Sequence, residues 1–246
     1  MKTLHALLAC SRSSTDVSAL SATGKYLNGV QMRIRFLFLF IVLVLWIIIN
    51  PLVSTSRAVE GLLSTLVLLS MVYSVSHTGR GMAVTLALGI PYAIVGWLNV
   101  FFVDRALQSL FTLLTAVFFG YLIYMALRFI RTTSGVTADS VLGAICIYLL
   151  IGLAWTSLYR LVTLFQWNSF TRVMSYSNLL YYSFITLTAV GDGKFKPISS
   201  TASTLTILEA ITGVLYIATI IALIVGAYSS SLIIKRQGQA DEDGGD

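Results

Sequence analysis

Long stretches of this chain carry almost no charge, and that constrains its fold more than any other feature. Hydrophobic residues make up 57% of its 246 positions and charged residues only 11%, which is far too apolar for an ordinary soluble domain. Six stretches approach or exceed the ~20 residues that a helix needs to cross a bilayer. They lie at 36–54, 58–76, 82–103, 106–127, 140–163 and 203–234. We therefore predict an all-α, multi-pass membrane protein with about six transmembrane helices.

The basic residues indicate how these helices are oriented. In the short loops of membrane proteins, Lys and Arg favour the cytoplasmic side. We place the N-terminus in the cytoplasm, which also puts Arg80, the pair Arg128 and Arg131, and the pair Lys235 and Arg236 on that side. Both termini are then expected in the cytoplasm, and the loop between the last two spans faces outward. The basic balance of the chain reflects membrane topology and does not indicate nucleic-acid binding.

The regions outside the last two spans give few functional signals. Residues 1–34 are rich in Ser and Thr and are predicted to form a disordered cytoplasmic segment, and 235–246 a short, solvated acidic tail. Residues 35–131 are expected to hold four transmembrane helices. The fourth has no basic residue between Arg105 and Arg128, whereas a voltage sensor needs several arginines. No gating stimulus follows from this region.

The most specific pattern lies between the last two spans, where residues 186–193 read TLTAVGDG. The apolar segment before it, 175–187, is about 20 Å of helix and too short to span. Gly191 and Gly193 can take positive φ at little steric cost, so a run of peptide units can point its carbonyl groups to one side. Such carbonyls can replace the hydration shell of a cation. The pattern therefore favours ion conduction.

The stretch TLTAVGDGKFKP resembles the pore loop of the tetrameric potassium-channel superfamily, which typically reads T-x-T-T-V-G-Y-G before an acid. Residues 202–216 resemble the inner helix of bacterial channels of this class, and VGDG is similar to the prokaryotic non-selective sodium/potassium channel. The resemblance implies a homotetramer in the bacterial inner membrane, with no cofactor except permeant ions and no nucleic-acid partner. It implies a pore domain at 138–234 with a re-entrant pore helix and a selectivity filter of Thr188, Ala189, Val190, Gly191, Asp192 and Gly193. Potassium or sodium ions would bind the carbonyls of Ala189, Val190 and Gly191.

Three residues depart from the potassium pattern. Ala189 replaces a threonine and removes a hydroxyl oxygen, Asp192 replaces a tyrosine whose ring would pack behind the filter, and Lys194 replaces an acid. We expect the chain to conduct potassium with weakened discrimination against sodium. Asp192 either attracts cations at the mouth or accepts backbone N–H groups behind the filter, and the sequence leaves both open.

Two residues of the last span stand out. Glu209 is the only acid in it, and a charge facing lipid near a helix centre costs about 2.5–3.5 kcal/mol. It must face protein or water, and we expect it to support the filter through a hydrogen bond to the pore helix or the filter backbone. Gly213 lies where such inner helices commonly bend, so it is a candidate gating hinge. Close packing against the pore helix is the other explanation.

Two alternatives remain beside the channel. Aspartyl intramembrane proteases carry a G-x-G-D string, which residues 189–192 miss by one position. That chemistry needs two carboxylates that share a proton. No second aspartate lies within a span, since Asp104 and Asp139 are at membrane edges, which leaves Glu209 as the alternative. A subunit of a pore family that does not conduct is the second alternative. We predict that the chain is not an enzyme.

Overall fold

The computed structural model describes residues 37–52, 59, 61–62, 65–70, 79–102, 104–132, 138–191 and 193–243. These residues are almost entirely helical and contain no strand, which confirms the all-α class. The helices are α3 (Gly79–Phe101), α4 (Arg105–Thr132), α5 (Ala138–Phe165), α6 (Tyr176–Leu187) and α7 (Ser200–Asp243), and an apolar helix at Leu37–Leu52 precedes them. The predicted segment 1–34 lies outside the described residues.

Four helices are long and apolar enough to cross a membrane. Their apolar segments are Met82–Phe101, Arg105–Arg128, Val141–Phe165 and Ser200–Leu223, and they match the last four of the six predicted spans. The first predicted span, 36–54, corresponds to the shorter helix Leu37–Leu52. The second, 58–76, is described only at residues 59, 61–62 and 65–70. The chain is therefore a multi-pass membrane protein with four candidate spans among the described residues.

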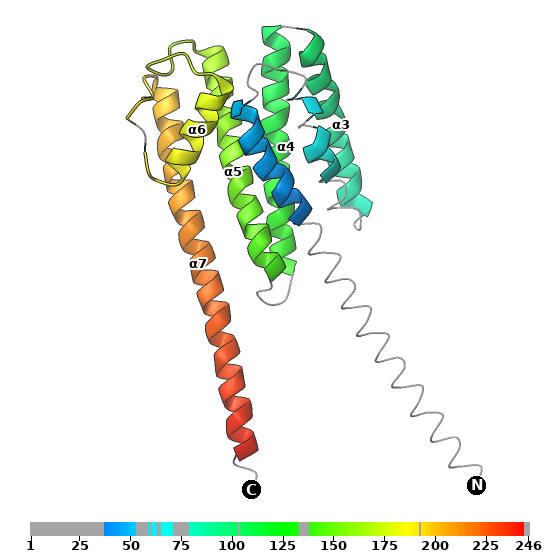
Figure 1. Cartoon of the computed structure of the whole chain (residues 1–246), viewed down its shortest axis with the longest axis vertical. Coiled ribbons are helices and arrows are strands. Elements are labelled where there is room, and N and C mark those ends of the chain that lie inside the picture. The colour runs from blue at the N-terminus through cyan, green and yellow to red at the C-terminus, as the bar shows by residue number, and fades with distance from the viewer. Residues whose placement is uncertain are drawn as a thin grey trace, which may run out of the picture.

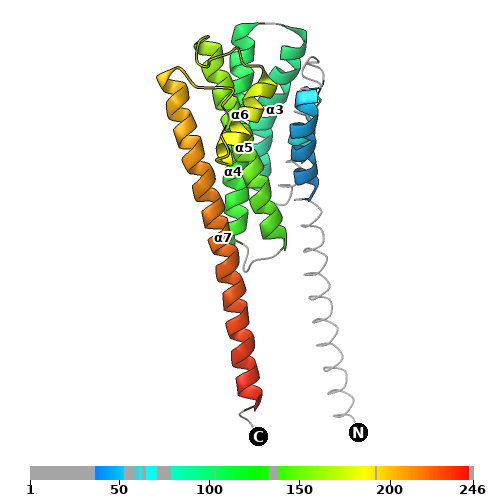
Figure 2. The ribbon, with the colours of Figure 1, turned by 60° about the vertical axis from the view of Figure 1, so that its left-hand side comes forward.

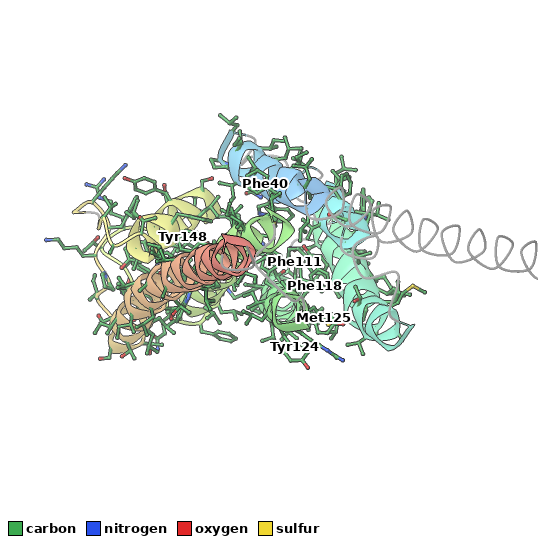
Figure 3. The ribbon with its side chains drawn as sticks, turned by 90° about the horizontal axis from the view of Figure 1, so that it is seen from below. Phe40, Phe111, Phe118, Tyr124, Met125 and Tyr148 are labelled. Carbon is green, nitrogen blue, oxygen red and sulfur yellow. The ribbon has the colours of Figure 1, made fainter. Side chains whose placement is uncertain are left out.

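The helices α3, α4 and α5 run antiparallel and form a bundle (Figure 1). Aromatic stacking joins α3 to α4, because the ring of Tyr92 lies 5.5 Å from that of Phe111 and 5.0 Å from that of Phe118. The Leu37–Leu52 helix joins the same core through Trp46, which meets Phe119 edge to face at 6.5 Å. Figure 3 shows Phe111 and Phe118 between α4 and α3. We call the end of the bundle where α5 ends and α6 begins the loop end.

The last helix extends further than the sequence predicted. A span at 203–234 and a disordered tail were expected, but α7 begins at Ser200 and continues to Asp243. No proline follows Pro197, so no residue blocks the helical hydrogen bonds over this range. At a rise of 1.5 Å per residue the helix is roughly 66 Å long, about twice the apolar thickness of a bilayer. Figure 2 shows it running past the ends of α4 and α5.

Candidate functional site

The chain approaches and leaves α6 at the same end of the bundle. An antiparallel bridge joins Phe170, before the helix, to Pro197, after it. Beside this bridge the N–H of Thr171 donates to the carbonyl of Lys196 over 3.0 Å. We call residues 188–199 the α6–α7 loop, and its described residues therefore run back along α6 to the loop end (Figure 1).

The N-terminal end of α6 is fixed by its own cap and by two other helices. The side chain of Ser175 accepts a hydrogen bond from the N–H of Asn178 and caps the first turn. The indole N–H of Trp46 donates to the hydroxyl of Tyr176 over 3.4 Å. The guanidinium of Arg160 on α5 lies 5.2 Å from the centre of the Tyr176 ring, within the range of a cation–π interaction. The first residue of α6 thus contacts both the Leu37–Leu52 helix and α5.

The C-terminal end of α6 has the hydrogen bonds of a Schellman motif. The N–H of Val190 donates to the carbonyl of Ile185 over 3.0 Å, and the N–H of Ala189 donates to the carbonyl of Thr186 over 2.9 Å. Ala189 follows the cap residue with a left-handed φ of 57°. Glycine is usual at this position, because a side chain costs about 1–2 kcal/mol there. The helix therefore ends on a strained alanine.

The same hydrogen bonds set the direction of the backbone carbonyls. The N–H groups of Thr188, Ala189, Val190 and Gly191 all donate to carbonyls in the last turn of α6. In a trans peptide unit the C=O points opposite to the N–H, and the described residues contain no cis peptide bond. The carbonyls of residues 187–190 consequently point away from these acceptors. Three of them, on Thr188, Ala189 and Val190, belong to residues that are exposed in the single chain, and Val190 is 77% exposed.

The predicted filter residues are placed only in part. Gly191 has the expected positive φ, 75°, but Gly193 does not, and Ala189 takes the second left-handed conformation instead. The carbonyls of Ala189 and Val190 point away from α6, as an ion site would require. The carbonyl of Gly191 belongs to a peptide unit shared with Asp192, which lies outside the described residues.

Glu209 is completely buried and joins three helices. Its Oε1 accepts a hydrogen bond from the hydroxyl of Ser183 on α6, and its Oε2 accepts one from the hydroxyl of Tyr159 on α5, each over 2.5 Å. The Ser183 hydroxyl also lies 2.8 Å from the carbonyl of Gly152 on α5. The acid on α7 thus contacts α6 five residues before Thr188. Both carboxylate oxygens are engaged by hydroxyl donors.

Gly213 lies against the last residue of α6. A Cβ atom added at this position would stand 1.9 Å from the carbonyl oxygen of Leu187 and 2.8 Å from its carbonyl carbon. Only a glycine allows α7 to approach the end of α6 this closely. Of the two roles that the sequence left open, this contact favours close packing.

Comparison with known protein families connects this geometry to a class of protein. A family model described as an ion channel matches residues 143–230, which cover most of α5, all of α6 and the first part of α7. This match supports a pore-loop ion channel family for this part of the chain. No curated protein and no solved structure matches the chain.

The matched segment 143–230 lies within the predicted pore domain, 138–234. The match to an ion channel family supports transport and gives the protease alternative no support. Among the described residues, no group of three or more His, Cys, Asp or Glu side chains could hold a metal ion. Sequence reasoning missed Tyr159 and Ser183 as partners of Glu209. The available signal was that a buried acid in this channel segment needs hydroxyl or N–H donors on the helices that face it.

Proposed function

We propose that four copies of this chain form a cation channel whose α6–α7 loops surround one central axis. The observation that carries this proposal is the run of carbonyls on Thr188, Ala189 and Val190, which point away from α6 on the exposed side of the loop. Carbonyls from four chains could then coordinate a dehydrated cation between them. In this arrangement α6 is a re-entrant pore helix and α7 lines the pore.

The need for other copies follows from what a single chain leaves uncovered. Non-helical backbone at membrane depth persists only where protein or a water-filled cavity surrounds it. The α6–α7 loop exposes 77% of Val190. Large apolar residues are also exposed along one broad face of α7: Ile207, Leu208, Ile211, Val214 and Leu215. Neighbouring copies would cover part of this surface and enclose the loop.

The end of α6 favours a positive ion. The C-terminus of a helix carries roughly half a negative charge, and four such ends would face one cavity. Thr188 adds a side-chain oxygen, since its hydroxyl donates to the carbonyl of Phe184 over 2.8 Å and keeps its lone pairs for another partner. Glu209 would support this arrangement through Ser183, by holding α6 in place instead of binding the ion.

The proposed selectivity is weak. Ala189 offers a carbonyl but no hydroxyl, so one potassium site loses four side-chain oxygens in the tetramer. Asp192 cannot fill the space of a tyrosine ring, which would let the outer half of the filter widen. Both changes reduce the difference between potassium and sodium, and we propose that the channel conducts both ions.

The reversal potential of the purified full-length chain tests this proposal. With potassium on one side of a planar bilayer and sodium on the other, a value near zero is expected. A value near the potassium equilibrium potential would refute weak discrimination but retain the channel. The absence of any cation current would refute the channel itself.

The variant Asp192→Tyr tests the cause of the weak selectivity. It should move the reversal potential toward the potassium equilibrium value, because a ring can again pack behind the filter. The matched variant Asp192→Asn removes the charge without adding a ring and should move it less. Equal shifts in the two variants would assign the effect to charge and not to packing.

A further inference from the structure

We infer that the basic residues of the loop end repel cations that approach from that side. Cations then enter the pore less readily at the loop end than at its opposite end, and the cation current is smaller in the direction that starts at the loop end. This inference rests on the proposed channel function. It predicts that the cation current differs between the two directions and names the residues that cause the difference. Its main determinant is Lys194, and Arg172 and Lys196 contribute.

The charge balance of the loop end is positive. Between residues 165 and 203 the chain contains three basic side chains, Arg172, Lys194 and Lys196, and a single acid, Asp192. The net charge of this segment is therefore +2 in each chain and would be +8 in a tetramer. The three basic residues are all exposed. A surface with this charge lowers the local concentration of cations.

Backbone contacts fix the position of Lys196 at the loop end. The N–H of Lys196 donates to the hydroxyl of Thr171 over 3.2 Å, and the carbonyl of Lys196 accepts from the N–H of Thr171 over 3.0 Å. This pair holds Lys196 beside Arg172, the next residue along the chain. Both residues therefore lie in the segment where the α6–α7 loop returns to the loop end.

Of the three basic residues, Lys194 is the nearest to the filter residues in the sequence. It follows Gly191 by three residues, so their Cα atoms are at most about 11 Å apart. The Nζ atom lies 5.2 Å from the centre of the Phe195 ring, and Phe195 is only 4% exposed in a cluster with Tyr159 and Tyr182. The anchored ring keeps the lysine backbone in place beside the end of the filter.

The size of the effect follows from Coulomb's law. In water without salt, one unit charge ~10 Å from the ion path lowers the local cation concentration about twofold, and four symmetric charges lower it about 16-fold. The screening lengths at ionic strengths of ~0.01, ~0.15 and ~1 M are ~30, ~8 and ~3 Å. Screening therefore reduces the ~16-fold lowering of the local cation concentration to about sevenfold at ~0.01 M and about twofold at ~0.15 M. At ~1 M almost no lowering remains. The inference therefore predicts a strong dependence on salt.

The test uses Lys194→Gln in the full-length chain, with single-channel current recorded in planar bilayers. Potassium chloride at the loop end is set to about 10 mM, 150 mM and 1 M in turn. In Lys194→Gln, the cation current from the loop end should exceed that of the unmodified chain about sevenfold at about 10 mM and about twofold at about 150 mM. At about 1 M the two currents should be equal. Current in the opposite direction should change little. Lys196→Gln should act in the same direction and provides a second variant.

The matched control is Arg128→Gln, which removes an exposed charge near the opposite end of α4. It should leave current from the loop end unchanged at every salt concentration. A Lys194→Gln effect that is the same in dilute and concentrated salt would overturn the electrostatic inference while leaving the channel intact. Complete absence of cation current in every variant would instead overturn the proposed channel, and this inference with it.

Discussion

Replacing Gly213 with alanine tests the closest contact between α7 and α6. The new Cβ would lie 1.9 Å from the carbonyl oxygen of Leu187. Carbon and oxygen atoms that are not bonded normally approach to about 3.3 Å, so α7 or the end of α6 would have to move by about 1.4 Å. The atoms that it meets are backbone and cannot rotate away as a flexible side chain could.

The direction of the change in unfolding free energy distinguishes the two roles of Gly213, close packing and a gating hinge. Overpacking of this kind costs about 1–3 kcal/mol, and a backbone clash belongs at the upper end of that range. Alanine regains about 1 kcal/mol of helix propensity. We therefore expect a net destabilisation of about 2 kcal/mol. If Gly213 served only as a flexible hinge, the same variant would be stabilised.

The measurement is unfolding in a graded mixture of mild and denaturing detergents, followed by near-ultraviolet circular dichroism. The control is Gly120→Ala in the middle of α4, where an added Cβ would meet no atom within 4 Å. This control should gain up to about 1 kcal/mol. If Gly213→Ala gained stability like the control, the packing argument would be wrong.

Substitutions at two further positions test the surroundings of α6 by the same unfolding assay. Glu209→Leu should lose about 1–3 kcal/mol, since the buried Tyr159 hydroxyl would lose its 2.5 Å acceptor, whereas Glu209→Gln keeps an acceptor and should lose less. Equal losses would show that the hydrogen bond is not what the acid contributes. Ala189→Gly should gain about 0.5–1 kcal/mol of stability. The strain of the left-handed φ of 57° is relieved, and this gain is larger than the entropy that glycine costs in the unfolded chain. Unchanged or reduced stability would contradict the inferred strain.

The positions of α5 and α6 were predictable because their signals are local. The boundaries at 140–163 agree with α5 at Ala138–Phe165 to within two residues. The short segment before the filter was identified at 175–187, and α6 occupies Tyr176–Leu187. A lack of charge over a given length, and a pair of glycines after a short apolar segment, can both be read without knowledge of distant residues.

Other features depend on contacts that no local pattern encodes. The left-handed conformation falls on Ala189 and not on Gly193, because the hydrogen bonds of the α6 end determine which residue must turn. The partners of Glu209 depend on how α5, α6 and α7 align, and the sequence leaves that alignment free. The length of α7 was underestimated because charge marks the end of a membrane span but not the end of a helix.

The attachments of α6 at its two ends have a mechanical consequence. Its first residue, Tyr176, is held by Trp46 from the N-terminal part of the chain, and its last residue, Leu187, is touched by Gly213 of α7. Because α6 has contacts at both ends, a movement of the residues that contact either end would tilt the helix. Displacements that begin in the N-terminal helices and displacements that begin in α7 would therefore both change the angle of α6, and with it the direction in which the carbonyls after the helix point.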